Sequence, residues 1–106
     1  MNVHAIIVAA GKGVRAGGDV PKQYQMVAGQ PLLRRAIERL AAHPGIAAIT
    51  VVVGADDCTL YARATAGLAL APGVIGGATR QDSVRNGLES LASNPPALVL
   101  VHDAAR

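Results

Sequence analysis

Aromatic residues are nearly absent from this chain of 106 residues, which has no Phe, no Trp and only Tyr24 and Tyr61. Hydrophobic residues nevertheless make up 51% of the sequence, so the core must be built from Ala, Val, Leu and Ile. Such residues fill parallel strands and their covering helices better than they fill an aromatic-rich β-sandwich. The composition therefore favours an α/β protein, and the length fits one small domain.

Cysteines and long apolar runs are also scarce. Cys58 is the single cysteine, so the sequence holds no disulfide framework and no cysteine-based zinc site. No apolar run approaches the ~18 residues of a membrane span, and His4 and a glycine-rich segment interrupt anything like a secretory signal. We therefore expect a cytoplasmic protein with no membrane partner.

Positive charge is in excess, with a net charge of +3, and the excess lies early in the chain. Nucleic-acid binding would favour denser basic clusters and aromatic stacking platforms, which the sequence lacks. A small anionic substrate explains the excess with fewer assumptions. We therefore expect a small-molecule substrate and no nucleic-acid partner.

Short apolar runs alternate with helical periodicity. Strands are predicted over residues 4–10, 49–53, 73–75 and 97–101. Helices are predicted over residues 31–42, with Pro31 in the first turn, over 57–67, with Asp57 as a possible cap, and from Asp82 or Ser83 to before Asn94. The first helix should carry Arg34, Arg35 and Arg39 on its solvated outer face, and the last should bury Val84, Leu88 and Leu91.

This alternation predicts an α/β, Rossmann-like and mostly parallel sheet with right-handed crossovers and helices on both faces. In such sheets ligands bind outside the carboxyl ends of the strands. Three polar loops, over residues 9–23, 76–82 and 102–106, leave those ends. We expect them to converge on one edge of the sheet.

The loop after the first strand, AAGKGVRAGGDVPKQ over residues 9–23, combines glycines with three cations. Glycines let backbone N–H groups approach a phosphate closely, and the cations supply charge beside it. Gly13 to Gly18 has P-loop spacing, but Asp19 and Val20 follow where Lys and Ser or Thr are required. A Rossmann fingerprint would need a helix at once, and the next strand lies only near residue 50. A long cationic loop that wraps a triphosphate is the better interpretation.

Three groups of residues are candidates for the chemistry. Arg15 and Lys22 would stabilise charge at the phosphorus that undergoes substitution, since nucleotidyl transfer depends on positioning and electrostatics. Asp103 would hold Mg²⁺, which takes few protein oxygens besides phosphates and water, or would cap a following helix. Ser83 would donate to a base or cap its own helix, and Arg80 would brace the loop.

Four segments together resemble the 2-C-methyl-D-erythritol 4-phosphate cytidylyltransferase family, in its N-terminal nucleotide-binding half. They are AAGKGVR over 9–15, PKQY over 21–24, GGATRQDSV over 76–84 and VHDAAR over 101–106. The first two are shared more loosely with other nucleotidyltransferases, and the last two narrow the resemblance to this family. It implies a nucleotidyltransferase fold of the glycosyltransferase-A-like kind. Residues 1–106 would form the nucleotide-binding part of its single domain, with the remainder absent.

The resemblance implies transfer of CMP from CTP to 2-C-methyl-D-erythritol 4-phosphate, with release of pyrophosphate, in the non-mevalonate pathway to isoprenoid precursors. It implies Mg²⁺ as cofactor and a homodimer in the full-length protein. By similarity, Arg15 and Lys22 are catalytic and Asp103 lies near the metal. The residues near nucleotide and acceptor would be Ala9, Ala10, Gly11, Gly13, Gly77, Ala78, Ser83, Asp103, Ala104 and Arg106. Ala78 stands where many members carry a polar residue, but backbone contacts to cytosine would survive that change.

Two alternatives stay open at this point. A sibling nucleotidyltransferase would use another polyol or sugar phosphate, of which ribitol phosphate is the nearest rival acceptor. A nucleotide-binding fragment without catalysis is the other, because the sequence stops at Arg106 directly after a predicted strand. We expect the 106-residue piece alone to be inactive or nearly so.

Overall fold

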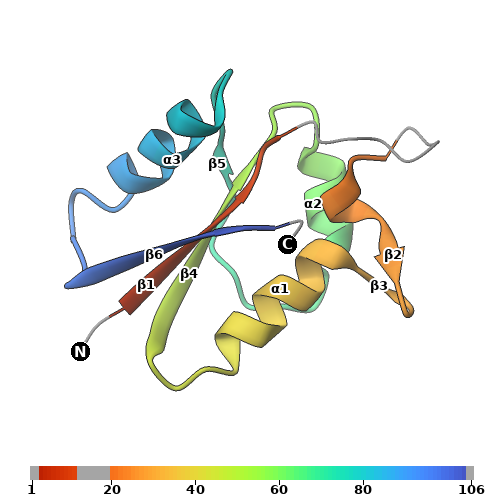
Figure 1. The fold of residues 1–106 in the computed structure, drawn as a ribbon, viewed down its shortest axis with the longest axis horizontal. Coiled ribbons are helices and arrows are strands. Elements are labelled where there is room, and N and C mark those ends of the chain that lie inside the picture. The colour runs from red at the N-terminus through yellow and green to blue at the C-terminus, as the bar shows by residue number, and fades with distance from the viewer. Residues whose placement is uncertain (1–2, 12–19, 105–106) are drawn as a thin grey trace.

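A parallel sheet of four strands organises the computed structural model, which describes residues 3–11 and 20–104 (Figure 1). Its strand order is β5–β4–β1–β6, formed by Val74–Ile75, Ile46–Val53, Val3–Ala9 and Leu98–Asp103. The helices are α1 (Leu32–Ala41), α2 (Cys58–Ala64), α3 (Arg80–Glu89) and the short 3-10 helix η1 (Lys22–Tyr24). A small antiparallel pair, β2 (Met26–Val27) and β3 (Gln30–Pro31), precedes α1.

The core lies on both faces of β1, the strand between β4 and β6. Successive side chains of a strand point to opposite faces. On one face Ile6, Val8 and Val52 pack with Val84 and Leu91 from α3 and the turn after it. On the other face the sheet packs against α1 and α2, through Ile7, Ala9, Val51, Val53, Leu33, Ile37 and Ala64. Figure 1 shows α3 on one side of the sheet and α1 and α2 on the other, which confirms the predicted architecture.

The boundaries differ from the predicted ones where the residues have weak preferences. β4 begins at Ile46 rather than Ile49, because Ile46 and Ala48 still pair with β1. α2 is shorter than predicted and has no side-chain cap, although Asp57 occupies the N-cap position. Pro31 immediately precedes α1 instead of lying in its first turn.

The bounds of α3 differ as well, since the helix is Arg80–Glu89. The helix begins at Arg80, because the Thr79 hydroxyl accepts a hydrogen bond from the Asp82 amide at 3.0 Å. An N-terminal cap of this kind supplies an acceptor for an amide that has no partner within the helix. Farther along the helix, Leu88 is 44% exposed, while Gly87 is buried against Val52 and Ile6 of the sheet. The prediction that Leu88 belongs to the core was therefore wrong.

Two arginines of α1 form hydrogen bonds to backbone carbonyls of other elements, so they do not face only solvent. Arg34 donates from Nη1 to the carbonyls of Ala64 and Ala66 at 3.3 and 2.7 Å. Arg35 donates from Nε and Nη2 to the carbonyls of residues 27 and 28, at 2.8 and 3.1 Å. These hydrogen bonds connect α1 to the end of α2 and to the β2–β3 turn. The prediction of a solvated outer face is therefore confirmed for Arg39, which is exposed, and was wrong for Arg34 and Arg35.

No helix in residues 3–11 and 20–104 is long and apolar enough to cross a membrane.

Candidate functional site

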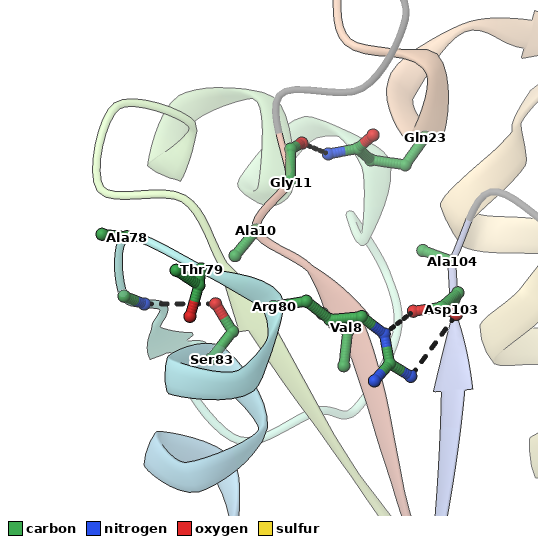
Figure 2. Close-up of a pocket in the computed structure, with 11 residues that line it drawn as sticks. Val8, Ala10, Gly11, Gln23, Ala78, Thr79, Arg80, Ser83, Asp103 and Ala104 are labelled. Atoms are coloured by element: carbon green, nitrogen blue, oxygen red, sulfur yellow. Dashed lines mark hydrogen bonds and ion pairs between the residues drawn. The ribbon is translucent and has the colours of Figure 1, made fainter.

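A pocket of about 670 Å³ opens at the carboxyl ends of β1 and β6, beside the first turn of α3 (Figure 2). Its walls come from three segments that are far apart in the sequence, together with Gln23 of η1. The lining residues are Val8, Ala10 and Gly11 at and just after the end of β1, Gly77, Ala78, Thr79, Arg80 and Ser83 around the start of α3, and Asp103 and Ala104 at the end of β6. The predicted convergence of three loops on one edge is therefore confirmed.

Most of the predicted site residues that the structure describes line this pocket. Ala9 lies just below it, buried in the core at the end of β1. Lys22 is exposed and does not line the pocket, but it is next to Gln23, which does. The predicted residues Gly13, Arg15 and Arg106 fall outside the described residues.

The loop from Gly76 to Thr79 is held by the first turns of α3. Ser83 is 2% exposed, and its Oγ accepts a hydrogen bond from the Gly77 amide at 3.1 Å. Thr79 caps the helix, so the alternative that Ser83 serves as the cap was wrong. Within the described part of the chain the Ser83 O–H finds no acceptor. That hydroxyl hydrogen is available to a ligand in the pocket.

Gly76 allows this loop to lie against β1. A Cβ at this position would overlap with the Cβ of Ala10 and lie 2.6 Å from Ser83 Oγ. We expect Gly76→Ala to destabilise the full-length protein by about 1–3 kcal/mol, the usual cost of overpacking. Urea denaturation of the variant measures this change.

The matched control for this change is Gly45→Ala. The nearest neighbours of a Cβ at Gly45, at 3.2 Å, belong to the exposed ring of His43. This ring is held by a hydrogen bond from the Gly45 amide to Nδ1 at 3.0 Å, at a site where water can replace it. The Gly45 variant should retain nearly the wild-type free energy of unfolding. Equal stability of the two variants would contradict the close packing at Gly76.

An ion pair crosses the pocket from α3 to β6 (Figure 2). The guanidinium of Arg80 approaches the carboxylate of Asp103, with Nε 3.0 Å from Oδ1 and Nη2 3.5 Å from Oδ2. The two side chains are 59% and 22% exposed. Exposed pairs of this kind contribute roughly 0–1 kcal/mol. Arg80 thus links the first turn of α3 to the end of β6, and a stronger partner can displace it from the carboxylate.

The pocket offers one carboxylate to a metal. Across residues 3–11 and 20–104 no group of three or more His, Cys, Asp or Glu side chains could hold an ion by itself. Mg²⁺ often uses one or two carboxylates and completes its shell with substrate phosphates and water. Asp103 fits that pattern, so the donor set suits a metal that arrives with a nucleotide.

Lys22 projects from a well-anchored helical turn. Gln23 and Tyr24, which follow Lys22 in η1, are buried, and Tyr24 belongs to the core cluster that also includes Leu33 and Ile37 of α1. Burial raises the pKa of the Tyr24 hydroxyl, so this group stays neutral and serves as a packing anchor. The backbone of Lys22 is therefore fixed while its ammonium group faces solvent.

Comparison with models of protein families shows which family this chain belongs to. The family model of IspD, 2-C-methyl-D-erythritol 4-phosphate cytidylyltransferase, matches residues 3–106. The chain belongs to the IspD family. The match spans all three segments that line the pocket.

Curated relatives and solved structures agree with this assignment. The bifunctional IspD/IspF enzyme of Rhodopseudomonas palustris strain TIE-1 is 55% identical over 102 residues, which are 96% of this chain and 26% of that enzyme. The corresponding enzyme of Rhodospirillum rubrum is 54% identical, with 98% and 27% covered. The chain thus spans about a quarter of the length of these relatives.

Solved IspD structures share the fold. The 4-diphosphocytidyl-2C-methyl-D-erythritol synthase of Anaerococcus prevotii superposes with a TM-score of 0.78 at 30% identity, covering 98% of this chain and 43% of that one. IspD of Francisella tularensis gives a TM-score of 0.70 at 30% identity, with 100% and 45% covered. The nucleotidyltransferase fold inferred from the sequence is therefore confirmed.

Three features of this IspD-family pocket escaped the sequence analysis. Thr79 as the helix cap had a local signal, because Thr79 and Asp82 form a capping-box-like spacing. Gln23 had none, since its contacts reach residues 12 and 14 positions away. The pairing of Arg80 with Asp103, 23 positions apart, also required the arrangement of strands in space.

Proposed function

We propose that this chain is the nucleotide-binding part of an enzyme that transfers CMP from CTP to 2-C-methyl-D-erythritol 4-phosphate and releases pyrophosphate. One observation carries the proposal: the start of the glycine loop, Ser83 and Asp103 line a single pocket at the carboxyl edge of the sheet. Membership of the IspD family supports the choice of CTP and of the acceptor. Residues 1–106 would be one part of a single nucleotidyltransferase domain.

In this proposal the base end of the nucleotide lies at the α3 side of the pocket. Cytosine presents ring nitrogen and carbonyl acceptors, and the free O–H of Ser83 is a matching donor. The backbone groups of Gly77 and Ala78 would complete the contact, because both residues line the pocket there. The methyl group of Ala78 adds no polar side-chain contact, so recognition at that position would depend on the backbone.

The triphosphate would lie along the loop that starts at Gly11, with Ala9, Ala10 and Gly13 around it. A phosphate oxygen of the acceptor attacks the α-phosphorus of CTP, a new P–O bond forms, and the bond to the bridging oxygen breaks as pyrophosphate leaves. The acceptor oxygen is already anionic, so the protein needs no general base. Lys22 and Arg15 would stabilise the extra charge on the α-phosphate in the transition state.

The remaining assignments concern metal and acceptor. When bound, Mg²⁺ would neutralise phosphate charge, and Asp103 is the side chain suited to hold it. Ala104 lines the same end of the pocket, and Arg106 would face the acceptor by similarity to the family. We further propose a cytoplasmic homodimer that needs no membrane or nucleic-acid partner.

The test uses the full-length protein with CTP, Mg²⁺ and a panel of acceptors. Pyrophosphate release should require 2-C-methyl-D-erythritol 4-phosphate and should fall sharply when UTP or ATP replaces CTP. Faster turnover with ribitol 5-phosphate would assign the protein to a sibling activity. CTP binding without turnover on any acceptor would overturn the proposed enzyme. Size-exclusion chromatography and cell fractionation test the dimer and its compartment.

Ser83→Ala tests the recognition of the base. The change removes the hydroxyl donor and leaves the Gly77 amide without its acceptor. A lost hydrogen bond of this type costs ~1 kcal/mol or somewhat more, so we expect the KM for CTP to rise about 5–10-fold. The kcat should change less, because the base is remote from the reacting phosphorus.

Ser90→Ala is the matched control on the same helix, since Ser90 also bonds to the backbone, from Oγ to the Gly87 carbonyl at 2.6 Å. Steady-state kinetics of both variants make the comparison. An unchanged KM for CTP in Ser83→Ala would remove Ser83 from base recognition.

A further inference from the structure

Gln23 occupies an unusual position for a polar side chain. It is 4% exposed, yet it lines the pocket, and Figure 2 shows its amide beside Gly11. Its Nε2 donates to two backbone carbonyls, those of Ala9 and Gly11, at 2.8 Å each. Both amide hydrogens are thereby used, which satisfies the donor end of a buried polar group.

These two hydrogen bonds close the base of the glycine loop. Ala9 is the last residue of β1, and Gly11 is where the chain has left the sheet. Their carbonyls lie beyond the strand pairing between β1 and β6, which reaches Val8 opposite Asp103. Ala9 still pairs with Val53 of β4, and Gln23 adds a link from these carbonyls to the segment that carries Lys22. The two ends of the loop are therefore held together by one side chain.

The same side chain fixes the place of Lys22. Gln23 follows Lys22 in η1, and the turn closes through the hydrogen bond from the Tyr24 amide to the Pro21 carbonyl at 2.9 Å. A shift of the Gln23 amide away from Gly11 would move the backbone of Lys22 relative to the loop. Misplacement by about 1 Å can cost ~10²-fold in rate even when the altered residue is remote from the reaction.

We propose that Gln23 is a positioning residue that fixes the place of Lys22 relative to Ala9 and Gly11, at the start of the glycine loop. The inference rests on the proposed nucleotidyl transfer, and it adds Gln23 to the residues that support that reaction. Gln23 acts through the carbonyls of Ala9 and Gly11, and the chemistry stays with the groups that contact the nucleotide. The carboxamide matters because its single nitrogen, Nε2, carries two hydrogens and donates one to each of the two carbonyls.

Two substitutions separate positioning from simple packing. Gln23→Met keeps a similar length and volume but supplies no donor. Gln23→Glu keeps the shape, and it sets a carboxylate against two carbonyls when ionised but offers one O–H donor when protonated. Gln25→Met and Gln25→Glu are matched controls, because Gln25 in the same segment donates from Nε2 to the Val20 carbonyl at 3.2 Å, at an exposed site.

The experiment measures kcat, the KM for CTP and the unfolding temperature of the full-length variants between pH 6 and pH 8.5. We expect Gln23→Met to lower kcat about 10–100-fold per folded molecule, with a smaller change in KM. Gln23→Glu should be equally impaired at high pH, and its kcat relative to wild type should rise as the pH falls and the carboxyl group is protonated. The Gln25 variants should follow the wild-type pH profile.

The outcomes distinguish the two levels of the proposal. Turnover by wild type together with wild-type kcat in both Gln23 variants would overturn the positioning role alone. A lower unfolding temperature with unchanged kcat per folded molecule and no altered pH profile would make Gln23 a packing residue only, and would also overturn it. Absence of turnover by the wild type would overturn the proposed function and the positioning role with it.

Discussion

Lys22→Ala in the full-length protein is expected to lower kcat by about 10²–10³-fold, the usual cost of removing one preorganised charge from such a site. The dissociation constant for CTP should change much less. Charge develops at the α-phosphorus only as the acceptor oxygen attacks, so a cation aimed there stabilises the transition state more than the bound nucleotide. Single-turnover kinetics, with CTP binding measured by calorimetry, separate the two effects.

The structure makes this expectation specific to Lys22. The residue is exposed, so its ammonium group is accessible, yet the turn beneath it is anchored by two buried neighbours. Arg39→Ala is the matched control, because Arg39 is an exposed cation on the outer face of α1. It should leave kcat unchanged. A decrease of less than about threefold in the kcat of Lys22→Ala would mean that Lys22 is only a solvated cation of the loop.

The replacement by arginine refines the test. Lys22→Arg keeps the positive charge but presents a planar group with a different reach and hydrogen-bond geometry. We expect it to recover part of the loss and to remain below wild type. Full recovery would mean that charge alone matters, and no recovery would mean that the placement of the nitrogen atom dominates.

The sheet could be predicted from the sequence because its strands are unmistakable. Ile6, Ile7 and Val8, and the valines at the end of β4, form short apolar runs that are too brief for helices and too apolar for loops. Once such strands are taken as parallel, the carboxyl-end rule brings the three loops together. That reasoning placed Gly11, Ser83 and Asp103 at one pocket without any coordinates.

The remaining features depend on contacts that local sequence does not encode. Leu88 has the spacing of a core residue, but the rotation of α3 is set by the close approach of Gly87, whose Cβ would lie 3.0 Å from Val52 Cγ2 and 3.1 Å from Ile6 Cγ2. Arg34 and Arg35 are predicted from the sequence to be solvated, because the carbonyls that accept their hydrogen bonds belong to other elements. The burial of Gln23 could not be predicted for the same reason, because its acceptors, the carbonyls of Ala9 and Gly11, are distant in the sequence.

Asp103→Asn is expected to lower kcat/KM by about 10²-fold at a fixed Mg²⁺ concentration, through the loss of one ligand charge beside the phosphates. The Mg²⁺ concentration for half-maximal rate should rise as well. Asparagine keeps the shape of the side chain and one oxygen, so the fold at the end of β6 is retained. Mg²⁺ titrations at saturating CTP measure the rate, and Mn²⁺ binding followed by paramagnetic resonance in the presence of CTP measures the metal without catalysis.

The ion pair to Arg80 supplies the control for this experiment. Arg80→Ala breaks the same pair from the other side but keeps the carboxylate. Because an exposed pair is worth roughly 0–1 kcal/mol, Arg80→Ala should change kcat/KM by no more than about fivefold. Removing a cation that competes for the carboxylate should lower the Mg²⁺ requirement. Equal losses in the two variants would mean that Asp103 matters only as the partner of Arg80. Unequal losses, with Mn²⁺ binding weakened only in Asp103→Asn, would identify the carboxylate as the group that meets the metal.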